Sequence, residues 1–148
     1  MINSPKMGVL MLRISHNDVE KILWHAAVCY PAECCGILAG RKLGEEYVVE
    51  RVYPARNMLE SSFEYRVNPE DQVRIFMDAE ADGLEVVGFY HSHPLGEAYW
   101  SSLDEERSKL WPGYIFLVVS HKTGSLRAYL RKEDETVEVN VEISTFTL

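Results

Sequence analysis

The sequence is poor in cysteine and has no long apolar segment. It contains three cysteines, an odd number, and no Cys-x-x-Cys pair. Neither a disulfide framework nor a cysteine-ligated zinc site is therefore expected, and the thiols are interpreted as small buried hydrophobic side chains. No apolar run reaches the roughly 18 residues that a membrane-spanning helix needs, so none is predicted.

Positive charge is also scarce. The chain has 15 Lys and Arg against 23 Asp and Glu, for a net charge of -8, and its basic residues are scattered. Because nucleic-acid binding depends on clustered basic side chains, this composition argues against a nucleic-acid partner. The N-terminus lacks the features of a secretory signal, so a cytoplasmic location is expected. Residues 1–8 are expected to be a dispensable extension, with Met7 as an alternative start.

What is present suffices for one globular domain. The 148 residues are 47% hydrophobic and 26% charged, enough to bury a single core and remain polar outside. Strand and helix patterns are mixed without strict alternation, which favours an α/β sandwich with a mixed or mostly antiparallel sheet. The predicted strands are residues 9–14, 35–39, 47–53, 63–67, 86–90, 115–120, 126–130 and 137–143.

Three helices are predicted between these strands. The first follows a capping box that begins at Ser15, and the second begins at Asn68 and ends at Gly83. The third occupies residues 102–110. In the second helix the spacing predicts that the following side chains face the core: Val73, Phe76 and Met77.

The residues that carry most chemistry follow the apolar run 86–90. Side chains two apart on a strand share a face, so His91 and His93 can both reach one metal ion. Imidazole and carboxylate groups suit Zn²⁺, and Asp104 would be a third ligand from beyond the next loop. Three protein ligands leave a position for water, which is typical of a catalytic zinc site.

A His-x-His pair by itself is weak evidence for a metal site. Ser101 and Asp104 also fit a capping box at the start of a helix, and for these two residues alone capping is the favoured interpretation. The interpretations are compatible, because a ligand in the first helical turn can also cap that turn. The other three histidines are expected to be surface or packing residues: His16, His25 and His121.

The complete string His91-Ser92-His93-Pro94-x6-Ser101-x-x-Asp104 resembles the JAMM motif of the MPN+ metalloproteases. The resemblance covers residues 9–130. It implies that one Zn²⁺ is bound by His91, His93 and Asp104, and that Ser101 helps to stabilise an oxyanion.

The family's general base lies upstream, in a Pro-x-Glu-x-Cys-Gly segment. The matching segment here is residues 31–36, so the resemblance assigns that role to Glu33. Without the resemblance, a solvated turn residue is the favoured interpretation of Glu33, and Glu97 is the second candidate for the base. Trp100 departs from the proline that many bacterial members have before the serine, a difference at the rim of the site.

The resemblance also implies a fold and an activity. The fold is a single MPN-type domain, a cytidine-deaminase-like sandwich with a curved sheet flanked by helices and zinc at one sheet edge. The activity is that of a zinc-dependent isopeptidase or peptidase. It hydrolyses the bond after the C-terminal Gly-Gly of ubiquitin or of a ubiquitin-like or sulfur-carrier protein, with a zinc-activated water and a glutamate base. The chain lacks long insertions and in this resembles prokaryotic members.

An extended carrier tail needs a groove beside the metal, and residues 56–63 are expected to form part of it. The predicted substrate contacts are Met58, Phe63 and Trp100, with ordinary packing as the alternative for each. The expected assembly is a homodimer or an MPN-type heterodimer.

Two other functional classes are alternatives to a peptidase. A catalytically silent MPN scaffold usually lacks the ligand set, which this chain retains. A zinc deaminase would require His-x-Glu and Pro-Cys-x-x-Cys motifs, and the sequence contains neither.

Overall fold

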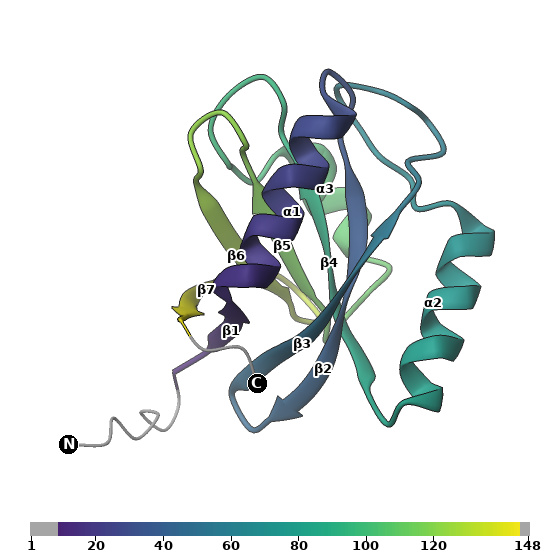
Figure 1. The fold of residues 1–148 in the computed structure, drawn as a ribbon. Coiled ribbons are helices and arrows are strands. Elements are labelled where there is room, and N and C mark those ends of the chain that lie inside the picture. The colour runs from purple at the N-terminus through teal and green to yellow at the C-terminus, as the bar shows by residue number, and fades with distance from the viewer. Residues whose placement is uncertain (1–8, 146–148) are drawn as a thin grey trace.

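The computed structural model describes residues 9–145, and the predicted N-terminal extension lies outside this range. In chain order the elements are β1 (Met11–Ser15), α1 (His16–Cys29), β2 (Cys35–Leu43), β3 (Glu46–Ala55), α2 (Pro69–Ala81), β4 (Glu85–Ser92), α3 (Ser102–Ser108), β5 (Ile115–Val119), β6 (Leu126–Arg131) and β7 (Thr136–Ser144) (Figure 1). No helix among the described residues is long and apolar enough to cross a membrane.

The seven strands form one curved, mixed sheet. Their order is β1-β3-β2-β4-β5-β6-β7, and β7 also pairs with β1, so the sheet closes on itself. β1 is parallel to both of its neighbours and β4 is parallel to β5, whereas the remaining neighbours are antiparallel. The predicted α/β domain with a curved mixed sheet and flanking helices is confirmed.

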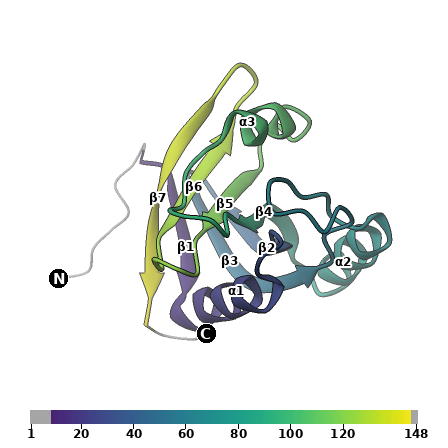
Figure 2. The ribbon, with the colours of Figure 1, turned by 90° about the horizontal axis from the view of Figure 1, so that it is seen from above.

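Helices cover both faces of this sheet, with α1 and α3 on opposite sides (Figure 2). Ile22 of α1 belongs to one apolar cluster, and Ile75 of α2 belongs to another. Because side chains alternate along a strand, β4 contributes Tyr90 to the α1 cluster and Phe89 to the α2 cluster. The same alternation turns His91, two residues after Phe89, toward the α2 side.

The predicted helix starts are confirmed by their caps. The Ser15 hydroxyl accepts a hydrogen bond from the Asp18 backbone N–H, and the Asn68 side chain accepts from the N–H groups of Glu70 and Asp71. These short side chains satisfy backbone donors that a helix leaves unpaired at its first turn. The local sequence therefore determines where α1 and α2 begin.

Two predictions about the region 63–81 are wrong. Residues 63–67 form no strand and contribute only the isolated bridge between Val67 and Asn57. In α2 the buried positions are 71, 75 and 79, spaced by four, so Val73 and Met77 are 60% and 66% exposed. Phe76 is half-buried against the core. Helical spacing by itself allows either stripe to face the core, and in the structure the stripe of Asp71, Ile75 and Ala79 faces it.

Replacing Gly88 with alanine should destabilise the fold. An added Cβ would lie 2.2 Å from the Ile115 carbonyl oxygen, because β4 and β5 approach closely there. We expect a cost of about 1–3 kcal/mol and a Tm lower by about 4–10 °C in thermal unfolding followed by circular dichroism. Gly96→Ala is the matched control, since nothing lies within 4 Å of its added Cβ. Equal Tm values for the two variants would contradict the close approach.

Candidate metal centre

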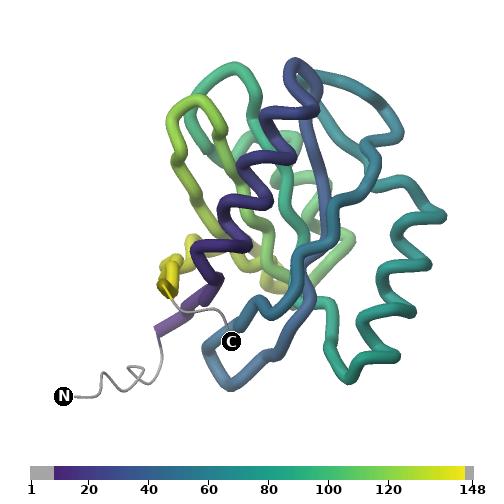
Figure 3. The backbone as a smooth tube through the Cα atoms, viewed as in Figure 1, coloured from purple at the N-terminus to yellow at the C-terminus, as the bar shows by residue number. Residues whose placement is uncertain are grey.

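Four loops gather at one end of the sheet, which is the upper end in Figure 3. They are residues 30–34, 56–68, 93–101 and 120–125. Hydrogen bonds join them in pairs: the Glu33 N–H donates to the Ser61 carbonyl, and the Ala98 N–H donates to the Ser125 hydroxyl. β4 ends among these loops, so the polar side chains at its carboxyl end are surrounded by protein.

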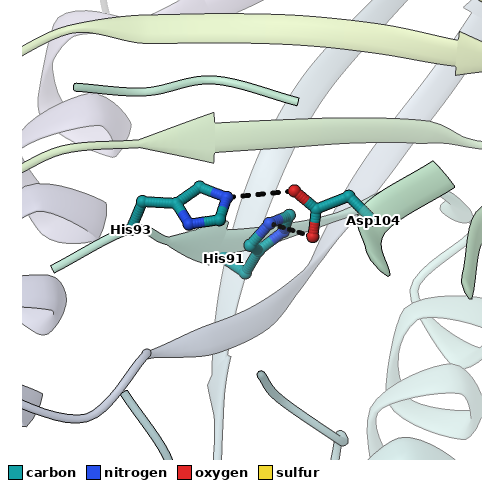
Figure 4. Close-up of side chains that lie close together, drawn as sticks. All are labelled: His91, His93 and Asp104. Carbon is teal, nitrogen blue, oxygen red and sulfur yellow. Dashed lines mark hydrogen bonds and ion pairs between the residues drawn. The ribbon is translucent and has the colours of Figure 1, made fainter. Parts of the chain in front are cut away.

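His91 lies at this end of β4, His93 follows directly after the strand, and both face one carboxylate. Nε2 of His91 is 3.0 Å from Oδ1 of Asp104, and Nε2 of His93 is 3.0 Å from Oδ2 (Figure 4). Their ligand atoms all lie within 4.8 Å of one another. β4 is flanked by β2 and β5, so the cluster lies at the end of an internal strand. The expected position at a sheet edge is wrong, because the described strands form a closed sheet.

Asp104 is brought to the histidines by the start of α3. The Ser101 hydroxyl accepts from the Asp104 N–H at 3.0 Å, and the Asp104 carboxylate accepts from the Ser101 N–H at 3.1 Å. This is the predicted capping box. The carboxylate that caps α3 also faces both imidazoles. One side chain therefore both caps the helix and belongs to the histidine–aspartate cluster.

The charges of the cluster are buried. His91, His93 and Asp104 are 0%, 7% and 6% exposed. Burial by itself would raise the pKa of Asp104, but the neighbouring His91 and His93 and the Ser101 N–H hold this pKa well below its ordinary value. The Asp104 carboxylate is therefore ionised and faces two nitrogen donors.

Glu33 lies beside the cluster and is 1% exposed. Its Oε2 is 3.9 Å from Nδ1 of His93. Burial, and next the negative charge of Asp104, raise the pKa of Glu33 to about 8. Within residues 9–145 neither carboxylate oxygen has a hydrogen-bond partner, and neither does Nδ1 of His91.

Unpaired buried polar atoms are costly and rare, so they are a reason to expect a ligand at this position. Two imidazole nitrogens and a carboxylate oxygen are a donor set that suits Zn²⁺. The residues present therefore fit a metal ion bound between His91, His93 and Asp104.

Two tyrosines that the sequence reasoning did not assign to the site stack on its histidines. The ring of the buried Tyr65 lies 4.5 Å from that of His91, and the ring of Tyr99 lies 4.4 Å from that of His93. Tyr99 is 51% exposed, so it forms part of the rim. Tyr65 comes from the segment wrongly predicted as a strand, and no sequence signal identified it.

The predicted substrate contacts come from two different loops. Trp100 stacks on Tyr129 at 4.6 Å, and its indole N–H donates to Glu105. Met58 and Phe63 are 50% and 75% exposed on the 56–68 loop. Glu97, the second candidate for the base, is exposed.

A separate groove runs between α1 and β3, lined among others by Trp24, Val49 and Pro54. It includes neither Glu33 nor any member of the histidine–aspartate cluster. Because its lining lacks the clustered donor atoms, the chemistry of the described chain is assigned to the end of β4.

When the site holds no metal, the free energy of unfolding should depend on the charge of Glu33. The pKa of this group rises from its ordinary 4.5 to about 8 in the folded protein, so the native state keeps a proton that the unfolded chain releases. The free energy of unfolding therefore decreases as the pH rises from about 4.5 to about 8. We expect the Tm of the chelated protein to fall relative to Glu33→Gln by at least about 3 °C between about pH 5 and 8. Since the pKa of Asp104 lies below this window, a constant Tm difference would mean that Glu33 ionises freely in the fold.

Comparisons with known proteins agree with this geometry. Residues 16–132 match the family described as prokaryotic homologs of the JAB domain. A desampylase of Haloferax volcanii is 38% identical over 137 residues, 89% of this chain and 96% of that protein. A probable TtuB-protein conjugate cleaving protease of Thermus thermophilus is 29% identical over 133 residues, 89% of this chain and 84% of that protein.

The fold has relatives among solved structures as well. The solution structure of a Desulfitobacterium hafniense protein matches with a TM-score of 0.83 and 29% identity, over 92% of this chain and 94% of that protein. The match of the family to most of the chain and the identity to the desampylase establish the relationship. The chain therefore belongs to the prokaryotic JAB-domain homologues, within the JAMM/MPN+ family that its motif resembles.

Proposed function

We propose that the protein is a zinc-dependent isopeptidase that hydrolyses the bond after the C-terminal Gly-Gly of a ubiquitin-like or sulfur-carrier protein. The similarity to its relatives identifies the chain as a hydrolytic peptidase of the JAMM type. The observation that carries the finer proposal is the buried cluster of His91, His93 and Asp104 with the carboxylate of Glu33 beside it.

In this proposal one Zn²⁺ is held by His91, His93 and Asp104. When bound there, zinc acts as a Lewis acid toward water and the scissile carbonyl. The protein contributes a buried pocket in which Asp104 is ionised and the two imidazoles are oriented by stacked tyrosines. Fixed ring orientation matters, because a ligand nitrogen must point at the metal.

Glu33 is the proposed general base. Its buried carboxylate lies on the His93 side of the cluster, and burial favours its protonated form. A carboxylate with a raised pKa can take a proton from water and later deliver it to the leaving amine. No hydrogen bond to the described residues 9–145 occupies its oxygens, so both remain available for this transfer.

Ser101 is the proposed oxyanion donor. Its oxygen accepts from the Asp104 N–H, whereas its own O–H donates to no group within residues 9–145. A hydroxyl can do both at once. The O–H is therefore free to donate toward the oxygen of the scissile carbonyl as negative charge develops there.

The substrate class rests on the relatives and on the exposed apolar side chains of the 56–68 loop. The Thermus relative is named for cleaving protein conjugates. The exposed Met58 and Phe63 are available to contact a carrier tail, and Tyr99 forms part of the rim beside His93. The role of Trp100 as a contact remains a prediction.

The metal assignment predicts zinc content. Wild type should carry about one zinc per chain, and His91→Ala/His93→Ala should lose it, because a single remaining carboxylate ligand binds zinc weakly. Elemental analysis by mass spectrometry of the purified proteins measures this. His16→Ala is the control, since His16 lies on the exposed side of α1. Equal zinc in wild type and the double variant would refute the assignment.

The proposed reaction predicts one cleavage site and one essential carboxylate. The probe is a ubiquitin-like protein whose C-terminal Gly-Gly is linked to the lysine of a fluorescent peptide. Mass spectrometry should find the new C-terminus directly after Gly-Gly, and chelation should abolish cleavage. Glu33→Gln should retain zinc and lose at least about a hundredfold in turnover.

Glu97→Gln is the matched control, because Glu97 is an exposed carboxylate on the 93–101 loop. It should keep near wild-type turnover. Loss in Glu97→Gln with retention in Glu33→Gln would move the base to Glu97, and cleavage at many unrelated sites would point to a general protease.

A further inference from the structure

We propose that Asn57 is a positioning residue that holds Glu33 in place for catalysis. The proposal rests on the proposed function, since it takes Glu33 to be the base. Asn57 lies 24 residues after Glu33 in the sequence and does not belong to the motif.

The Asn57 side chain makes four hydrogen bonds. Its amide nitrogen donates to the Glu33 carbonyl at 3.1 Å and to the Glu64 carbonyl at 3.2 Å. Its amide oxygen accepts from the N–H groups of Leu59 and Arg66, each at 3.0 Å. A primary amide can form four such hydrogen bonds, two as donor and two as acceptor. The Asn57 side chain uses all of them to connect Glu33 with the 57–66 segment.

Glu33 is held by this segment at both of its backbone groups. Its N–H donates to the Ser61 carbonyl at 2.8 Å, and its carbonyl accepts from Asn57. Its carboxylate, in contrast, has no hydrogen-bond partner among residues 9–145. The backbone bonds are therefore the polar contacts that determine where the carboxylate lies.

The 57–66 segment is itself shaped around Asn57. The Met58 N–H donates to the Arg66 carbonyl at 2.8 Å, and the Glu60 N–H donates to the Asn57 carbonyl at 3.2 Å. Arg107 of α3 pairs with Glu64 at 2.8 Å, and the Glu64 carbonyl accepts from Asn57. The segment thus joins Glu33 to the helix that carries Asp104, and Asn57 bonds both Glu33 and Glu64.

Removing the amide would leave the Glu33 and Glu64 carbonyls and two N–H groups without their partner. Backbone groups that lose a hydrogen bond in a partly buried site favour local opening. A displacement of about 1 Å in a catalytic group can cost on the order of a hundredfold in rate. Loss of Asn57 should therefore act on turnover through Glu33, with the metal ligands unchanged.

Two variants test this. Asn57→Ala removes all four bonds, whereas Asn57→Asp keeps the acceptors for Leu59 and Arg66 and loses the donors to Glu33 and Glu64. We expect both to retain zinc and to lose at least about tenfold in kcat on the Gly-Gly–lysine probe. In a Glu33→Gln background the same substitutions should have little further effect, because residues that act through one group are not additive.

The matched control is Asn68→Ala. It removes the cap of α2, in which the Asn68 side chain accepts from the N–H groups of Glu70 and Asp71, and a third bond from the Arg56 guanidinium at 3.3 Å. It therefore lowers stability without removing a bond to Glu33. At a comparable loss of Tm it should keep near wild-type kcat. Equal kcat losses in Asn68→Ala and Asn57→Ala would overturn the proposal, as would full additivity with Glu33→Gln.

Hydrogen exchange provides a readout that does not depend on activity. In both Asn57 variants the Glu33 amide should lose protection, whereas Asn68→Ala should deprotect only the start of α2. Unchanged protection of Glu33 would overturn the proposal. If Glu33→Gln is fully active, the base assignment has failed instead, and exchange at Glu33 alone then decides whether Asn57 holds this residue.

Discussion

The burial of one ionised carboxylate is the constraint on which the site depends. Asp104 is 6% exposed, and a buried charge is tolerated only when opposite charges or donors surround it. Two imidazole nitrogens at 3.0 Å and the Ser101 N–H fulfil this requirement. The groups that stabilise the buried Asp104 charge are therefore of the same kind as the ligands that suit Zn²⁺.

The fold creates this burial by ending an internal strand inside the protein. β4 has a neighbour on each side, so its last residues cannot face open solvent at a sheet edge. The four loops gather at this end (Figure 3). The rings of Tyr65 and Tyr99 stack on His91 and His93 and complete the enclosure. Low exposure in turn raises the pKa of Glu33, so the same enclosure that holds the cluster also suits the neighbouring carboxylate to hold a proton.

The local sequence predicted most of the elements because their signals are local. Ser15 and Asn68 begin helices by capping them, and Gly83, the predicted end of the second helix, adopts a positive φ. The prediction failed where neighbours outside the segment decide the outcome. Residues 63–67 alternate like a strand but pair instead with the Asn57 region, and α2 turned a different stripe toward the sheet than the one that contains Val73 and Met77.

In the site, the sequence by itself determined that His91, His93 and Asp104 come together, because a strand and a helix cap position them. His91 and His93 share a face because strand side chains alternate, and Asp104 is fixed by its cap to Ser101. Glu33 was identified only through the family resemblance. The tertiary structure alone decided its burial, its tie to Asn57 and Ser61, and the stacking of Tyr65 on His91. These contacts join segments far apart in the chain, and the periodicity within a segment carries no information about which distant segment it will meet.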